Sequence, residues 1–130
     1  MKHTEGFLKL VDDAKSRVRE VSVADTQERM RENTQAKLID VREDKEWDAA
    51  HAARAIHLGK GIIERDIETT VPDKKTELIL YCGGGYRSAL AADALQHMGY
   101  TNVFSMAGGW KAWQEEGGKI EQSTDYTESK

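Results

Sequence analysis

One cysteine and the glycines that follow it are the residues of this chain best suited to chemistry. Cys82, the only cysteine among 130 residues, is followed by Gly83, Gly84, Gly85, Tyr86, Arg87 and Ser88. Consecutive glycines can take φ > 0 conformations, so such a loop can curl until its N–H groups point inward and surround an anion. Arg87 adds a permanent positive charge, and an ionised thiol in such surroundings is a good nucleophile. The loop therefore predicts a reactive Cys82; a small buried apolar residue is the alternative interpretation.

The elements on either side place this loop at the end of a buried strand. Residues 77–81 are mostly apolar and β-prone, which predicts a central strand. Residues 88–98 predict a helix that Gly99 ends, and its first turn adds free N–H groups and the positive end of a dipole. In parallel α/β sheets ligands collect at the carboxyl ends of strands, and Cys82 follows such an end.

Strand and helix patterns alternate along the rest of the chain. Further strands are predicted at residues 21–23, 37–41 and 102–105, with an extended segment at 55–58. Helices are predicted at residues 5–20, from an Asp25 cap to 32, and at 43–50, 62–68 and 110–116. This alternation predicts an α/β domain with a mostly parallel sheet, on which the amphipathic N-terminal helix packs.

Composition and charge exclude several classes of function. A formal net charge of -4 gives no basic footprint for nucleic acid, and no apolar stretch approaches the ~18 residues of a membrane span. The first residues lack the apolar segment of a signal peptide, and a single cysteine forms no disulfide framework, so we expect a cytoplasmic, reducing setting. His51 and His57 have no metal-ligand neighbours at suitable spacing, so no metal site is expected.

Three motifs, taken in order, resemble the rhodanese family of sulfurtransferases. Residues 38–42, Leu-Ile-Asp-Val-Arg, are similar to the family's Asp-x-Arg strand end, and an acidic–aromatic pair follows at 46–47. Residues 80–88 match the cysteine loop, with a glycine and an arginine in their usual places. Residues 103–113 match the closing pattern of strand, Gly-Gly, helix and tryptophan. The resemblance covers about residues 21–117.

The resemblance implies a three-layer, rhodanese-like α/β fold. Its central, mostly parallel, five-stranded sheet is flanked by helices, and this chain carries an extra N-terminal helix. The expected organisation is that helix at 1–20, a rhodanese-like domain at 21–118 and a polar tail at 119–130.

The resemblance also implies transfer of sulfane sulfur without a metal or organic cofactor. The Cys82 thiolate attacks the outer sulfur of thiosulfate, a persulfide or a polysulfide, and the resulting persulfide passes sulfur to cyanide or a thiol. Residues 83–88 bind the substrate, Arg87 holds the anionic donor or anchors the loop, and Asp40 and Arg42 support the site. Because no second cysteine of the chain can resolve the persulfide, the acceptor is an external thiol, cyanide or a partner protein.

The chain departs from the family pattern in two places. Residues 50–55, Ala-His-Ala-Ala-Arg-Ala, stand where the family often has Gly-His-Ile-Pro-Gly-Ala, which predicts a different local backbone path. Gly83 and Gly84 stand where some members have basic residues, which favours a persulfide or polysulfide donor over thiosulfate.

Two other functions stay open at this point. Cysteine phosphatases and arsenate reductases also combine a thiolate with an arginine, but the phosphatases usually place five residues between the two. Here four residues separate Cys82 from Arg87, and Ser88 holds the phosphatase arginine's place. A shorter loop predicts a tighter cradle, better suited to a terminal sulfur than to a phosphoryl group. A non-catalytic binding module with the same fold is the other candidate, although the intact cysteine loop argues against it.

Overall fold

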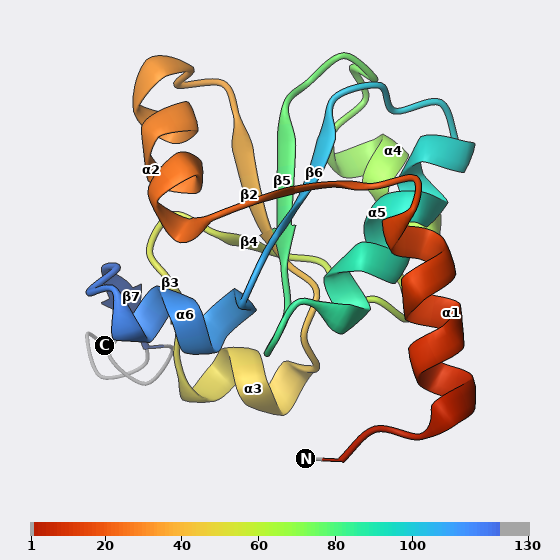
Figure 1. Ribbon diagram of the computed structural model, residues 1–130. Coiled ribbons are helices and arrows are strands. Elements are labelled where there is room, and N and C mark those ends of the chain that lie inside the picture. The colour runs from red at the N-terminus through yellow and green to blue at the C-terminus, as the bar shows by residue number, and fades with distance from the viewer. Residues whose placement is uncertain (1, 123–130) are drawn as a thin grey trace.

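A sheet of five parallel strands confirms the predicted α/β fold. The computed structural model describes residues 2–122, and its sheet is shown in Figure 1. The strand order is β1 (Arg19–Val21), β6 (Val103–Met106), β5 (Leu78–Tyr81), β2 (Lys37–Asp40) and β4 (Ile56–His57), with every neighbouring pair parallel. The strand that precedes Cys82, β5, is therefore the central one, as predicted.

Helices cover both faces of the sheet and complete the three layers (Figure 1). One face carries α2 (Val23–Glu32) and α6 (Gly109–Glu115), and the other carries α4 (Ile63–Thr70) and α5 (Tyr86–His97), with α1 (Glu5–Lys15) packed along α5. The short helix α3 (Asp44–Ala49) lies beyond the carboxyl end of β2.

The two cores follow from the alternation of side chains along β5. Successive strand residues point to opposite faces, so Leu78 and Leu80 join one apolar cluster while Ile79 and Tyr81 join the other. All four residues are fully buried, which is typical of a central strand covered by helices on both sides.

The N-terminal boundaries differ from the predicted ones. Helix α1 ends at Lys15 rather than at residue 20, and the strand predicted at 21–23 occupies Arg19–Val21. Pairing with β6 selects these residues for the edge strand, which local sequence patterns do not show. Helix α2 then begins at Val23, because Ser22 and not Asp25 is its cap: the Ser22 Oγ accepts the Asp25 N–H at 3.0 Å.

A second, two-stranded sheet ties the C-terminal region to the segment that departs from the family pattern. Strand β7 (Ile120–Glu121) pairs antiparallel with β3 (His51–Ala52), so part of the expected loose tail is ordered. The rest of that predicted tail, residues 123–130, lies outside the described residues.

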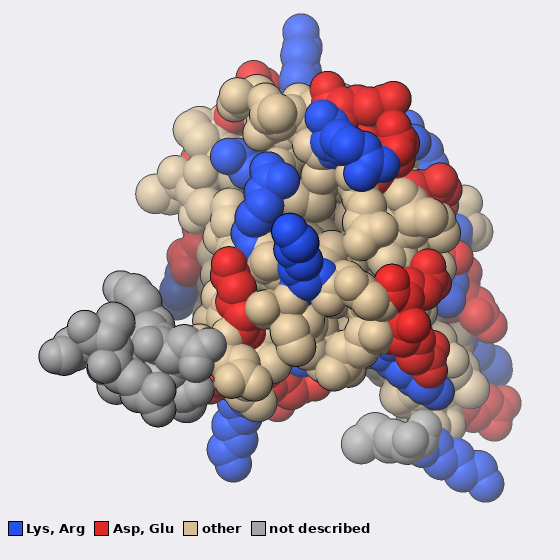
Figure 2. All heavy atoms as spheres, turned by 90° about the vertical axis from the view of Figure 1, so that its left-hand side faces the viewer, with Lys and Arg blue, Asp and Glu red and all other residues tan. Residues whose placement is uncertain are grey.

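Charged side chains of both signs are interspersed over the face shown in Figure 2. This distribution agrees with the small formal net charge of -4. None of the helices described between residues 2 and 122 is long and apolar enough to cross a bilayer.

Candidate active site

The loop after β5 donates one backbone N–H to the Cys82 sulfur and leaves other N–H groups of the loop without a partner. The Cys82 residue is 1% exposed, and its Sγ accepts the Gly85 N–H at 3.1 Å. Within residues 2–122, the N–H groups of Gly84, Tyr86 and Arg87 have no protein acceptor. These donors belong to the loop and to the first turn of α5, so together with the helix dipole they form a site suited to negative charge next to the sulfur.

The three loop glycines do not serve the same purpose. Of the three, all within the described part of the chain, only Gly85 has a left-handed backbone, with φ 101°. The prediction that consecutive glycines use φ > 0 is therefore wrong for Gly83 and Gly84. A Cβ at Gly84 would meet nothing within 4 Å, whereas one at Gly83 would lie 3.1 Å from Arg87 Nη2.

A pair of buried hydroxyl groups lies next to the sulfur, and one of the two, that of Ser88, contacts it. Ser88 Oγ lies 3.5 Å from Cys82 Sγ and 2.8 Å from Ser105 Oγ, and both serines are completely buried. The described residues that line the pocket over Cys82 do not include Ser88. Ser88, which was predicted to bind substrate, therefore contacts the nucleophile without lining the pocket. No motif in the sequence pointed to Ser105.

Arg87 forms an ion pair with a carboxylate of α3, so its guanidinium is not free to bind a ligand at the sulfur by itself. Its Nη1 and Nη2 donate to the Glu46 Oε1 and Oε2 at 2.8 and 3.2 Å. This hydrogen-bonded pair keeps the pKa of Glu46 below its usual value and raises the pKa of Arg87. Glu46 also accepts the Glu43 N–H at 3.0 Å, which closes a capping box at the start of α3. The ion pair thus links α3 to the cysteine loop.

Asp40 and Arg42 form a buried frame beside the loop. The Arg42 Nε and Nη2 donate to the Asp40 carboxylate at 2.8–3.1 Å, and Nη2 also donates to the Ala50 carbonyl at 2.7 Å. The Tyr81 hydroxyl donates to Asp40 at 2.5 Å, and burial, with the Asp40 charge, raises the pKa of Tyr81. Neither Asp40 nor Arg42 is among the described residues that line the pocket over Cys82.

The start of α6 presses against the backbone of the cysteine loop. The Trp110 N–H donates to the Cys82 carbonyl at 2.7 Å, and the Lys111 N–H donates to the Gly83 carbonyl at 3.2 Å. A Cβ at Gly109 would lie only 2.3 Å from the Cys82 carbonyl oxygen. The Gly108-Gly109 motif therefore allows a close approach that fixes the loop.

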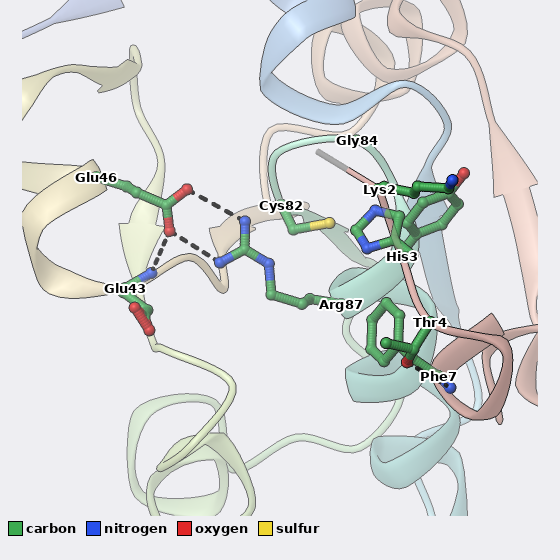
Figure 3. Close-up of a pocket in the computed structure, with 10 residues that line it drawn as sticks. Lys2, His3, Thr4, Phe7, Glu43, Glu46, Cys82, Gly84 and Arg87 are labelled. Atoms are coloured by element: carbon green, nitrogen blue, oxygen red, sulfur yellow. Dashed lines mark hydrogen bonds and ion pairs between the residues drawn. The ribbon is translucent and has the colours of Figure 1, made fainter.

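A pocket of about 640 Å³ opens over Cys82. Figure 3 shows Arg87 turned toward Glu46 on one side of the sulfur and His3 on the other side. The pocket is lined by the loop, by the start of α3 and by the N-terminal residues Lys2, His3, Thr4 and Phe7. These N-terminal residues were not predicted to line the site, because only the packing of α1 along α5 brings them to the loop.

The two histidines singled out in the sequence have structural partners. His51 Nδ1 lies 2.9 Å from the Trp47 carbonyl, and His57 Nε2 lies 2.8 Å from the Arg42 carbonyl. Both rings stack with Trp47, at centroid distances of 3.4 and 4.8 Å. Within the part of the chain that the structure describes, no group of three His, Cys, Asp or Glu residues could hold a metal ion.

Comparison with known proteins identifies the family. The family model described as Rhodanese-like domain matches residues 22–116. The chain belongs to the rhodanese family. The protein YtwF of Bacillus subtilis (strain 168), provisionally named a sulfurtransferase, is 33% identical to this rhodanese over 99 residues, which cover 76% of the chain and 93% of the relative.

Two solved structures are similar to this rhodanese over most of its length. The polysulfide-sulfur transferase homodimer of Wolinella succinogenes has a TM-score of 0.78 and 27% identity, covering 90% of this chain and 88% of its own. A protein of unknown function from Rhodopseudomonas palustris CGA009, named as a candidate tyrosine phosphatase, has a TM-score of 0.76 and 29% identity, covering 93% and 98%. The resemblance found in the three sequence motifs is confirmed.

Proposed function

We propose that this rhodanese transfers sulfane sulfur through a persulfide on Cys82. The observation that carries the proposal is the Cys82 sulfur beneath an open pocket, with the Gly85 N–H donating to it and further loop N–H groups free. Such donors stabilise a thiolate, and they also stabilise the charge that moves to the outer sulfur of a persulfide.

The reaction has two balanced steps. The Cys82 thiolate forms a bond to the outer sulfur of the donor, and the donor's own bond to that sulfur breaks, releasing sulfite from thiosulfate or a thiolate from a persulfide. In the second step cyanide or a thiol attacks the outer sulfur of the persulfide, and the Cys82 thiolate leaves. We propose a persulfide or polysulfide as the preferred donor, because no basic side chain occupies positions 83 and 84.

The supporting residues have different tasks in this proposal. Arg87 anchors the loop to α3 through Glu46 and contributes positive potential near the sulfur. Ser88 Oγ accepts from the Cys82 thiol at 3.5 Å, and it becomes the donor to the sulfur when the thiol ionises. Asp40 and Arg42 hold the neighbouring strand end, and act on the reaction only by positioning.

The Rhodopseudomonas palustris structure gives a reason to test phosphatase activity as well. The geometry argues against it, because Arg87 is engaged by Glu46 and the completely buried Ser88 stands at the phosphatase arginine's place. A phosphoryl group would then lack the free guanidinium that holds its oxygens. Hydrolysis of p-nitrophenyl phosphate without any sulfur transfer would favour the phosphatase function over the proposed one.

Intact-mass measurement after treatment with polysulfide or thiosulfate tests the proposed function. We expect a gain of one sulfur atom on Cys82, removed again by cyanide or a thiol. The Cys82→Ser protein is the matched control and should gain nothing. Absence of the adduct in the wild type with every donor contradicts the proposal.

A further inference from the structure

The N-terminal helix is fixed so that its first residues reach the reactive loop. Helix α1 buries Val11 and Ala14 against the domain and runs along α5. After the helix ends, Arg17 donates to both carboxylate oxygens of Asp93 on α5, at 3.0 and 2.8 Å. The Gln96 side chain also donates to the Arg17 carbonyl at 2.9 Å. Because these contacts set the position of α1, the residues at its start have a defined place beside the loop.

Three rings at the start of α1 and α5 form one wall of the pocket. His3 and Tyr86 meet edge to face with centroids 4.6 Å apart, and Phe7 lies 5.2 Å from His3 and 6.3 Å from Tyr86. All three are partly exposed, and all three line the pocket that contains Cys82. We call His3, Phe7 and Tyr86 the aromatic wall; it presents apolar surface to whatever molecule approaches the sulfur.

The charges around the pocket do not favour an inorganic dianion. The charged residues that line it among the described part of the chain are Lys2 and Arg87, Glu43 and Glu46, two of each sign. Arg87 is already bonded to both oxygens of Glu46. A donor with two negative charges, such as thiosulfate, therefore gains little from side chains here, while a single charge on the outer sulfur can still use the loop N–H groups.

We infer that the aromatic wall binds the carbon portion of an organic sulfane-sulfur donor, a compound that carries its outer, singly charged sulfur on an apolar group. Figure 3 shows His3 beside the sulfur, and Phe7 and Tyr86 line the same pocket. A donor can therefore place its organic group against the rings and its outer sulfur over Cys82. The inference rests on the proposed function and names the substrate class that the pocket selects. His3, Phe7 and Tyr86 are then specificity-determining residues.

Thiosulfonates are stable probes of this class. The Cys82 thiolate takes the terminal sulfur of R–SO₂–S⁻, a sulfur–sulfur bond forms on Cys82, the donor's sulfur–sulfur bond breaks, and the sulfinate R–SO₂⁻ leaves with its electron pair. Methanethiosulfonate and benzenethiosulfonate share the reacting group and the charge, and differ only in a methyl or a phenyl group. Their intrinsic reactivities differ with the sulfinate that leaves, but this difference is the same for every protein variant. The change in the phenyl-to-methyl ratio from wild type to variant therefore measures contact with the organic group.

The experiment compares kcat/KM for both thiosulfonates and for thiosulfate in the wild type and in Phe7→Ala. We expect the wild type to prefer the phenyl donor over the methyl donor by about tenfold, the value of one well-packed apolar contact. Phe7→Ala should remove most of that preference, because kcat/KM should fall much more for benzenethiosulfonate than for methanethiosulfonate and thiosulfate. Leu10→Ala is the matched control, because Leu10 lies on the same helix, is 57% exposed and does not line the pocket.

The outcomes separate this inference from the proposed function. Equal rates with the phenyl and methyl donors in the wild type, or an equal loss for all donors in Phe7→Ala, overturns the role of the aromatic wall while leaving sulfur transfer in place. A wild-type protein that takes sulfur from none of the three donors overturns both. Phe7→Leu keeps an apolar side chain at this position, and its partial retention of the phenyl preference supports the inference even if Phe7→Ala loosens α1.

Discussion

The carboxyl ends of two neighbouring strands are built in opposite ways. At the end of β2, the Asp40 and Arg42 charges are buried and bonded to each other, to the Tyr81 hydroxyl and to the Ala50 carbonyl. At the end of β5, Cys82 lies under a pocket, and nearby loop N–H groups have no acceptor within residues 2–122. The hydrogen-bonded groups at the end of β2 provide rigidity, whereas the free N–H groups at the end of β5 can still bond a ligand.

The largest expected effect is on the open strand end. Cys82→Ser should lower sulfur transfer by at least about three orders of magnitude, because a neutral hydroxyl is a far weaker nucleophile than a thiolate. The melting temperature should stay within about 2 °C, since the replacement has nearly the same size. A sulfur-transfer assay with calorimetry checks both, and turnover in this variant would remove Cys82 from its proposed role.

The arginines at the two strand ends should differ strongly in their effect on stability. Arg42→Ala leaves the Asp40 charge buried without its partner, so the free energy of unfolding should fall by about 3–5 kcal/mol. Arg87→Ala breaks a pair in which Glu46 is 38% exposed, and should cost less than about 1 kcal/mol. Urea unfolding of both variants is the measurement; similar losses would contradict the contrast between a buried frame and an open loop.

Adjacent glycines of the loop offer a matched pair of substitutions. Gly85→Ala forces a side chain into a left-handed conformation at φ 101° and should cost about 1–3 kcal/mol, together with slower reaction at Cys82. Gly84→Ala has open space and should change stability by less than about 0.5 kcal/mol. Chemical unfolding and iodoacetamide labelling of both proteins check this, and equal behaviour of the two would be inconsistent with the loop geometry.

The buried hydroxyl groups should affect the reactivity of the sulfur more than the fold. Ser105→Ala removes the partner that orients Ser88, and should slow iodoacetamide labelling of Cys82 at pH 7 about three- to tenfold, the effect of one hydrogen bond. Tyr100→Phe also deletes a buried hydroxyl, which bonds the Val71 carbonyl far from the sulfur, and should leave labelling unchanged. If both variants label at the same rate, Ser105 is only a packing residue.

The smallest effect concerns the pH dependence of the Arg87–Glu46 pair. The pKa of Glu46 is lowered in the folded protein, mainly by its hydrogen bond to Arg87. Glu46 therefore contributes stability that is fully present above its pKa of 4.5 in the unfolded chain and is lost as the pH falls through its pKa in the folded protein. The stability difference between wild type and Glu46→Gln should be below about 1 kcal/mol at pH 7 and should shrink as the pH falls below 4.5. Urea titrations at pH 7 and at a series of acidic pH values measure it, and a difference that grows in acid would show the opposite sign.

Short-range patterns in the sequence were sufficient for the central strand and for the position of the cysteine loop at its end. The apolar run before Cys82 and the helix after it predict a strand end, and β5 is indeed central in the sheet. The Gly108-Gly109 pair was part of a recognisable motif, and its physical reason is the close approach of α6 to the loop.

Features that depend on distant pairing could not be predicted from the sequence. The edge strand β1 is defined by its partner β6, and the aromatic wall exists only because α1 packs along α5. Phe7 has the spacing of a core-facing residue, so its place beside Cys82 carries no local signal. Glu46 and Arg87 are likewise 41 residues apart in the chain.

The tight contact between Gly109 and the Cys82 carbonyl should also affect how Cys82 reactivity is lost on heating. Trp113, buried in α6, and the 2.7 Å bond from Trp110 hold the peptide that bears the sulfur. We expect the short helix α6 to open at a lower free energy than the central sheet, which would release this peptide while the five strands are still paired. Loss of Cys82 reactivity on heating should therefore precede melting of the sheet, because it would follow the opening of a seven-residue helix.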